Sequence, residues 1–183
     1  PKKKYPVINY IYPGPQGGSV SSWDFAAYGR QDHQALAELG FIVVAIEGSC
    51  NPNRSKAFHD ACYGNMAENT LPDQMEGLKQ LQQRYPYMDL TKVGVWGHSG
   101  GGFATGAAMF NYPDFYKVGI SESGNHDNRN YEDDWGERYI GLEEKGPDGT
   151  TNYAKQANQM NAGNLKGKLM LAHVGSAMGI ICA

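Results

Sequence analysis

The sequence predicts an α/β fold: a mostly parallel sheet with helices on both faces. Short apolar runs alternate with longer helical patterns, which is typical of parallel βα units rather than of hairpins. Most of the apolar runs are continuous in Val, Ile and Leu, as buried parallel strands tend to be. The expected strands span residues 5–12, 41–47, 92–96, 117–121 and 168–173.

Three segments between these strands have a helical pattern. In the longest of them, Met75, Leu78 and Leu81 fall on one face. The expected helices span residues 32–39, 71–85 and 102–110.

Composition limits the class of ligand. The chain has 183 residues, 40% of them hydrophobic, which suits one domain with a sizeable core. A net charge of -3 gives no electrostatic reason to expect nucleic acid, so peptides or small molecules are the expected ligands. The longest apolar run, 41–46, is far below the roughly 20 residues that span a bilayer, and we expect no membrane crossing. The basic start lacks a signal peptide's apolar core, so any targeting segment is expected upstream.

The three cysteines, Cys50, Cys62 and Cys182, lack the spacing of a zinc site or a redox pair. We therefore expect no metal site and no cofactor. A disulfide between Cys50 and Cys62 is conceivable, but spacing alone does not define disulfide geometry. The compartment of the protein stays open for the same reason.

Two long polar stretches that contain glycine begin where strands are expected to end, at 48–69 and 124–149. Ligands of open α/β sheets bind beyond the carboxyl ends of the strands, so both stretches are candidate pocket walls. The alternative is that both are solvated surface loops that contain short helices.

The clearest motif is Gly97-His98-Ser99-Gly100-Gly101, which fits the pattern G-x-S-x-G. A β-branched strand ends at Trp96 directly before it, and a helix of small residues follows over 103–110. Such a strand-to-helix turn is the nucleophile elbow of α/β-hydrolases. The pattern also fits a phosphate-binding turn or a plain tight turn, but neither needs a serine at its apex. The sequence therefore favours a serine hydrolase with Ser99 as the nucleophile.

An elbow would hold Ser99 in strained backbone geometry and expose its Oγ to substrate, with the flanking glycines relieving clashes. The backbone N–H of Gly100 would lie at a helix N-terminus, where donor and dipole both stabilise a developing oxyanion. His98 adjoins the serine, but neighbouring residues in an elbow point apart. We therefore expect His98 to be a residue that packs or supports the site, and the general base to lie elsewhere.

Four segments carry a resemblance: Y-P-V-I-N-Y-I-Y-P-G-P at 5–15, A-F-H-D-A-C-Y-G-N at 57–65, V-W-G-H-S-G-G-G at 95–102 and E-R-Y-I-G at 137–141. Together they resemble the C-terminal catalytic domain of the prolyl oligopeptidase family, in its dipeptidyl-peptidase IV branch. The resemblance runs across nearly all 183 residues. It implies that 1–183 is one partial α/β-hydrolase domain of a serine peptidase.

In that branch, a tyrosine in a Y-x-G-P turn donates its hydroxyl to the oxyanion hole, and Tyr12-Pro13-Gly14-Pro15 matches this turn. The resemblance therefore implies that Tyr12 is the second oxyanion donor beside the Gly100 amide. The alternative is that Tyr12 is an aromatic residue at a strand end that packs on the core.

The family also places two aromatic residues around a proline-sized side chain, and Tyr131 and Trp135 fall on those positions. An apolar, flat-walled pocket would select a small ring by burial. Trp135 stands where the best-known member has tyrosine, so the exact selectivity stays open. The alternative is that both rings cover the core beneath a loop.

The acid and the base of a catalytic triad are not apparent. The strand 168–173 matches the family strand before the catalytic aspartate, but residues 174–183 contain no carboxylate. His173 resembles a structural histidine of the family, and His126 precedes any suitable acid strand. The resemblance implies that the family's last strand, final helix and histidine loop are missing. Because a serine without a positioned base is a weak nucleophile, we expect this chain alone to be nearly inactive.

Three functions follow, in order of support. The first is a serine peptidase that cleaves after proline or another small residue through an acyl-enzyme on Ser99. The second is an esterase or acyl hydrolase of the same fold, since the fold does not choose the bond. The third is a non-catalytic binding module that lost its triad; a truncated reading frame would leave the same gap.

The resemblance also implies partners and a location. A β-propeller usually precedes this domain and holds the acidic residues that grip a substrate's amino terminus, so exopeptidase and endopeptidase action are not separated here. Family members often form homodimers, and an extracytoplasmic location would fit the family. An incomplete sheet would leave apolar surface near Ile180 and Ile181, which predicts poor solubility or self-association.

Overall fold

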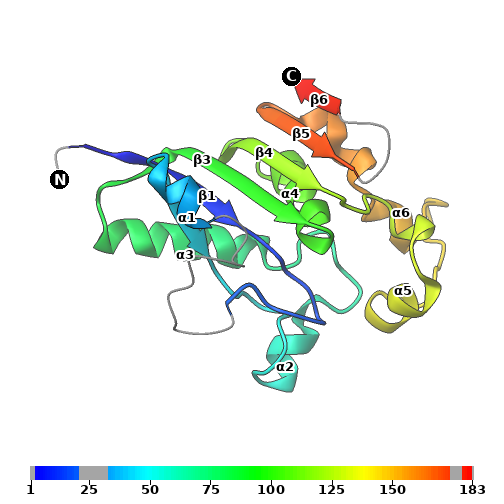
Figure 1. The fold of residues 1–183 in the computed structure, drawn as a ribbon. Helices are drawn as coiled ribbons and strands as arrows, with labels where there is room; N and C mark the ends of the chain where they lie inside the picture. The colour runs from blue at the N-terminus through cyan, green and yellow to red at the C-terminus, as the bar shows by residue number, and fades with distance from the viewer. Residues whose placement is uncertain (1–2, 21–32, 174–178, 183) are drawn as a thin grey trace.

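The core of the fold is a six-stranded sheet in the order β2-β1-β3-β4-β5-β6 (Figure 1). The computed structural model describes residues 3–20, 33–173 and 179–182. Strands β1 to β5 pair in parallel, as predicted, and β6 pairs antiparallel with β5. The strands are β1 (Tyr5–Tyr10), β2 (Ile42–Ala45), β3 (Met88–His98), β4 (Tyr116–Glu122), β5 (Lys168–Ala172) and β6 (Gly179–Cys182).

All five predicted strands are present, with bounds that differ from the prediction by up to four residues. The first strand ends at Tyr10 rather than at residue 12. The third begins at Met88, four residues before its expected start, because Tyr5 pairs with Met88 ahead of a register shift that follows Pro6. The stretch from 88 to 91 contains Asp89, whose side chain accepts from the Thr91 amide, so its local pattern reads as a turn.

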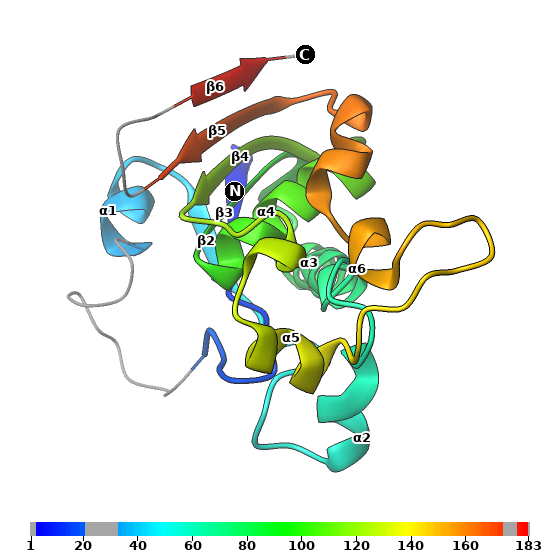
Figure 2. The ribbon, with the colours of Figure 1, turned by 90° about the vertical axis from the view of Figure 1, so that its right-hand side faces the viewer.

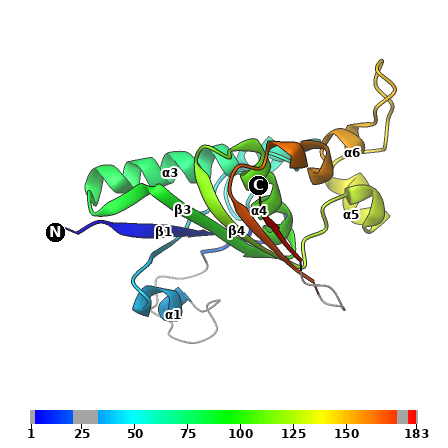
Figure 3. The same cartoon turned by 90° about the horizontal axis from the view of Figure 1, so that it is seen from above.

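Helices cover both faces of the sheet, as predicted. Helix α1 (His33–Glu38) lies on one face, and α3 (Leu71–Arg84) and α4 (Gly100–Asn111) lie on the other (Figure 3). Residue 32, the first of the expected helix 32–39, lies outside the described residues. The described residues include no helix long and apolar enough to cross a membrane.

Short helices lie in two connections that leave the carboxyl ends of β2 and β4 (Figure 2). The first two follow β2, and the other four lie between β4 and β5. Their bounds are α2 (Lys56–His59), η1 (Asp60–Cys62), η2 (Asn128–Asn130), α5 (Asp133–Tyr139), α6 (Asn152–Lys155) and η3 (Asn158–Asn164). The carboxyl edge of the sheet is therefore the one over which the chain builds its longest connections.

The main core lies between the sheet and helices α3 and α4. Residues 101–110 of α4 are all buried, and its small side chains let the helix approach β3 and β4 closely. A buried polar network crosses this core: the Tyr116 hydroxyl donates to Asn9 Oδ1 over 3.1 Å, and Asn9 Nδ2 donates to Gln74 Oε1 over 3.0 Å. Burial raises the pKa of Tyr116, so its hydroxyl stays a donor. The network fixes β1, α3 and β4 relative to one another.

The opposite face of the sheet, beside α1, carries an apolar cavity of about 680 Å³. Val7, Val95 and Ile120 are among the residues that line it, and Val118 at its margin is 48% exposed.

The prediction of apolar surface near residues 180 and 181 concerns side chains outside the described part of the chain. Solubility therefore stays a prediction.

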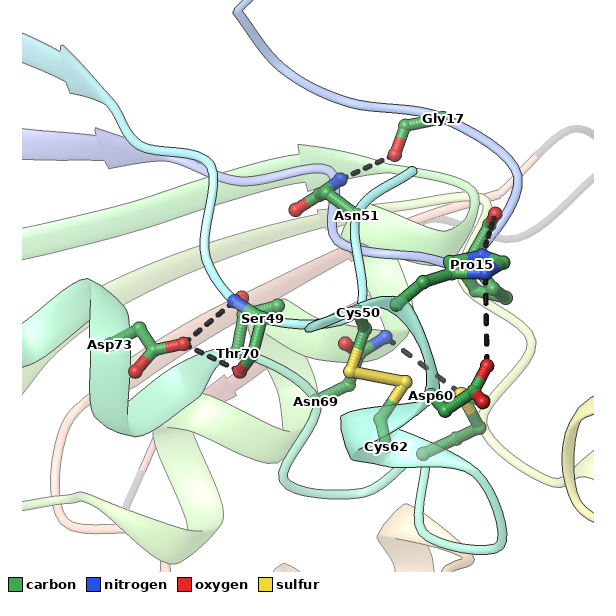
Figure 4. Close-up of a disulfide and its surroundings, with 12 residues drawn as sticks. Pro15, Gly17, Ser49, Cys50, Asn51, Asp60, Cys62, Asn69, Thr70 and Asp73 are labelled. Atoms are coloured by element: carbon green, nitrogen blue, oxygen red, sulfur yellow. Dashed lines mark hydrogen bonds and ion pairs between the residues drawn. A yellow bond between two sulfur atoms is a disulfide. The ribbon is translucent and has the colours of Figure 1, made fainter. Parts of the chain in front are cut away.

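A disulfide between Cys50 and Cys62 closes the first half of the connection after β2 (Figure 4). Both sulfurs belong to a second, smaller core that also contains Met66, Ile140 and Tyr153. The Cys50 N–H donates to the carbonyl of Phe58 over 2.8 Å, within the loop that the disulfide closes. The Cys50–Cys62 disulfide, which the sequence could not decide, is thus formed. It fixes the loop 50–62 at the carboxyl edge of the sheet.

Removing this disulfide should destabilise the protein. Replacing Cys50 and Cys62 with serine should lower the free energy of unfolding by about 3 kcal/mol, because the crosslink restricts the unfolded chain over a separation of 12 residues. Denaturant melts of wild type and double variant, each with and without a thiol-free reductant, would measure this. The reductant should destabilise the wild type and leave the variant unchanged; an equal effect on both would contradict the prediction.

Candidate active site

Ser99 forms a sharp turn between β3 and α4. Its backbone has φ 57° and ψ -117°, a strained conformation for a residue with a side chain. The Ser99 N–H donates to the carbonyl of Glu122 over 2.8 Å, and its carbonyl accepts from the N–H of Phe103 over 3.0 Å. Bonds on both sides therefore hold the strained turn in place. Ser99 is half-buried, and it lines a cavity.

The glycines on either side of the turn are required by close packing. A Cβ on Gly97 or on Gly101 would overlap the carbonyl oxygen of Ile11, and one on Gly102 would overlap that of Glu122. Gly100 is different, because the nearest atom to its Cβ would be the Pro13 oxygen at 3.6 Å, an ordinary contact. The backbone after β1 thus rests directly against the elbow, and only glycine permits this contact.

Gly100 is the first residue of α4, and the helix starts two residues earlier than the sequence predicted. The first amides of a helix have no partner within it, and the helix dipole makes this end attractive to negative charge. Gly100 also lines the cavity beside Ser99. An oxyanion that forms on a carbonyl attacked by Ser99 would meet this end of α4.

The cavity at Ser99 is small, about 80 Å³. Its walls come from the turn after β1 and from both polar stretches that the sequence marked as candidate walls. The stretch 48–69 supplies Met66 and Asn69, and the stretch 124–149 supplies Asn125, Asn128, Tyr131 and Trp135. Both stretches also contain short helices. They are therefore pocket walls and surface connections with short helices at the same time.

Tyr131 and Trp135 lie side by side on the cavity wall. Their ring centroids are 5.7 Å apart with an edge-to-face angle of 83°, and Trp135 makes a similar contact with Tyr139 at 5.2 Å. Trp135 also packs on the core around the disulfide, whereas Tyr131 is 43% exposed. The two aromatic residues singled out from the sequence therefore share one cavity with Ser99; their role in substrate binding stays a prediction.

Tyr12 leaves β1 beside the elbow. Its Cα would lie 3.5 Å from a Cβ on Gly101, and the following Pro13 and Gly14 line the cavity. The Tyr12 ring is half-buried. Tyr12 thus lies at the same edge of the sheet as Ser99, and its hydroxyl as an oxyanion donor stays a prediction.

His98 does not line the cavity, and its side chain is about half exposed. Its Nδ1 lies 3.9 Å from the carboxylate of Glu122, at the end of the neighbouring strand. The position fits the expectation that His98 points away from Ser99.

His126 is bound on both ring nitrogens. Asn158 Nδ2 donates to its Nδ1 over 2.8 Å, so Nε2 carries the proton and lies 3.2 Å from the Ser121 oxygen. Ser121 in turn donates to the carbonyl of Gly102 over 2.8 Å. Burial, and then the charge of His173, lower the pKa of His126, which keeps it neutral at pH 7. His126 therefore supports the first turn of α4 and is not placed as a base for Ser99.

Asp127 is equally committed to structure. Arg129 donates to both of its carboxylate oxygens, over 2.9 and 2.6 Å, and Gln159 donates to one of them. The hydrogen bond from the Arg129 side chain is the main cause that lowers the pKa of Asp127 to about 2. These bonds order the loop that carries Asn128 and Tyr131.

The sequence did not single out several cavity residues. Met66, Asn69, Asn125 and Asn128 line it, and Ser123, with φ 47°, forms a second strained turn at the end of β4. The only sequence signal for Met66, Asn69, Asn125 and Asn128 was their place in the polar stretches 48–69 and 124–149. Among the described residues, no group of three or more His, Cys, Asp or Glu side chains is placed to hold a metal ion.

Comparison with known proteins agrees with this geometry. The family model described as the prolyl oligopeptidase family matches residues 10–175. Dipeptidyl peptidase 8 of Homo sapiens is 36% identical over 122 residues, which are 66% of this chain and 13% of that protein. A dipeptidyl aminopeptidase IV-like structure from Bacteroides ovatus superposes with a TM-score of 0.83 at 32% identity, over 94% of this chain and 24% of that one.

A further solved structure, the acylaminoacyl peptidase of Pyrococcus horikoshii, is 25% identical with a TM-score of 0.77, over 93% of this chain and 27% of that one. The chain thus spans about a quarter or less of the proteins it matches. Its parallel sheet is that of an incomplete α/β-hydrolase fold. With a serine elbow on that sheet and a family match over nearly its whole length, the chain belongs to the prolyl oligopeptidase family.

Proposed function

We propose that this chain is the nucleophile-bearing part of a serine peptidase that cleaves after proline or another small residue. The observation that carries the proposal is Ser99, held in a strained elbow at the N-terminus of α4 and lining a small cavity. The peptidases among its relatives support the choice of an amide as the bond cleaved.

In the proposed reaction, Ser99 Oγ attacks the substrate carbonyl while its proton passes to a base. Negative charge forms on the carbonyl oxygen, where the Gly100 amide and the Tyr12 hydroxyl donate to it. The intermediate collapses, the amine leaves with a proton, and an acyl-enzyme on Ser99 remains. Water then attacks the ester and restores the serine.

The base and its acid partner are proposed to lie beyond residue 183. His98 and His126 are each oriented by other groups, and the Asp127 carboxylate is held by Arg129. The relatives contain several times the length of this chain, which leaves room for both residues and for an N-terminal propeller that would bind the substrate's amino terminus.

Selectivity is proposed to come from the size and walls of the cavity. A cavity of about 80 Å³ suits a small side chain. Tyr131 and Trp135 offer flat aromatic surfaces against which a proline ring can be buried. None of the described residues that line the cavity is charged, so a charged side chain at the same position would find no counter-charge.

Hydrolysis of chromogenic substrates by the full-length protein tests the proposal. We expect turnover of a Gly-Pro amide, much slower turnover of a Gly-Leu amide, and near-background rates for the isolated 183-residue chain, because it lacks the base. Turnover of simple esters without any proline amide would instead indicate an esterase. Robust turnover by the isolated chain would disprove the proposal that the general base lies beyond residue 183. No turnover by the full-length protein would instead favour a non-catalytic binding module.

A further inference from the structure

The turn that carries Tyr12 is held by side chains of the disulfide-closed loop. The segment 12–18 contains two prolines and three glycines and forms no helix or strand. The Ser19 hydroxyl accepts from the Tyr12 N–H over 3.0 Å, but this bond does not reach Pro15 or Gly17. Two carbonyls of the segment have partners in the loop 50–62. His59 Nε2 lies 2.7 Å from the Pro15 oxygen, and Asn51 Nδ2 donates to the Gly17 oxygen. Figure 4 shows Pro15 and Gly17 beside this loop.

The contact of His59 has a defined direction. A carbonyl oxygen only accepts, so Nε2 must carry a proton and donate to Pro15. The other ring nitrogen, Nδ1, lies 4.0 Å from the carboxylate of Asp60. The imidazole is therefore a fixed donor aimed at the turn, whatever its charge.

The backbone that carries the His59 imidazole is also held in place. His59 is the last residue of α2, a helix whose N-terminus is capped by the Ser55 hydroxyl, which accepts from the Phe58 N–H. The Cys50–Cys62 disulfide closes the loop around it. The loop 50–62 is therefore held by its own bonds, and it can fix the position of the Tyr12–Pro15 turn.

We propose that His59 is a positioning residue that holds the Tyr12 hydroxyl at the oxyanion site through Pro15. This inference rests on the proposed function and extends it. The turn touches the elbow on one side, where its backbone packs against Gly101, and the His59 loop on the other. Tyr12 thus lies between the elbow and the His59 loop, and loss of the His59 donor removes the bond that holds Pro15 while the bonds around Ser99 stay in place.

The test is the kinetics of His59→Ala and His59→Gln in the full-length protein on a Gly-Pro amide. The His59 side chain is 37% exposed, so alanine removes both the hydrogen bond and some packing, and the glutamine variant separates the two effects. We expect His59→Ala to lower kcat about 10- to 100-fold with KM changed less than threefold, since the oxyanion donor acts in the transition state. Glutamine places an amide donor near the same point and should restore most of kcat.

A double-mutant cycle with Tyr12→Phe separates positioning from general destabilisation. If His59 acts through Tyr12, His59→Ala should have almost no further effect on kcat once the hydroxyl is gone. Lys56→Ala, on the same short helix and 87% exposed, is the matched control and should leave kcat unchanged. Asn51→Ala, which removes the other bond to the turn, gives an independent reading and should lower kcat in the same direction.

Several outcomes would overturn the inference: an unchanged kcat in His59→Ala, equal losses in the glutamine and alanine variants, or additive effects in the cycle. These results would leave the proposed function intact. Absence of amide hydrolysis by the wild-type full-length protein would instead overturn the proposed function itself. If His59→Ala fails to fold, His59→Leu, which fills similar space without a donor, takes its place in the cycle with Tyr12→Phe under the same criteria.

Discussion

Replacing Ser99 with alanine in the full-length protein should lower kcat on a Gly-Pro amide by about 100,000-fold or more. The hydroxyl is the only atom lost, and no other described serine combines an elbow backbone with the N-terminus of a long helix. The melting temperature should change little, because alanine keeps the same strained backbone. Steady-state kinetics and a thermal melt on the same preparation would measure both quantities.

A serine-reactive fluorophosphonate probe gives a second measurement. It should label the wild-type protein and not Ser99→Ala. Ser49→Ala is the matched control, because Ser49 bonds to Asp73 of α3 and does not line the cavity. This control should keep both labelling and turnover. Labelling that persists in Ser99→Ala would show that the nucleophile is a different residue.

Replacing Gly101 with alanine should have the largest effect on folding. The added methyl would overlap the carbonyl oxygen of Ile11, which is backbone and cannot rotate away. We expect a loss of at least about 3 kcal/mol in the free energy of unfolding, from overpacking at a rigid site. Denaturant unfolding followed by circular dichroism would measure the loss.

Gly100→Ala is the matched control for this prediction. It lies one residue earlier in the same helix, and its methyl would lie 3.6 Å from the nearest atom outside its own segment. Removing a glycine from a helix restricts the unfolded chain, so stability should stay the same or rise slightly. A similar loss in both variants would show that helix propensity, rather than the contact with Ile11, sets the cost.

The sequence predicted the sheet and the nucleophile because both follow from local patterns. Short runs rich in Val, Ile and Leu located β1 to β5, and Gly97, Ser99 and Gly101 fit a turn that needs serine between glycines. The start of α4 was predicted two residues late, because glycines disfavour a helix in isolation. Burial against β3 and β4 overrides that preference here.

Other features could not be predicted because they depend on distant contacts. The start of β3 depends on pairing with Tyr5, and the sequence near Asp89 reads as a turn. The strand β6 was not expected, because four residues at 179–182 have no pattern of their own until they pair with β5. Cysteine spacing could not decide the disulfide, and the cavity role of Asn69 arises only when two remote connections meet.

The glycines of the elbow differ in how much room surrounds them, and this difference decides which of them can be substituted during evolution or engineering. Positions 97 and 101 are locked by the neighbouring backbone, whereas position 100 has room for a side chain at the rim of the cavity. A library confined to position 100 could therefore reshape substrate preference while leaving the scaffold intact, and the same library at 101 would mostly yield chains that do not fold.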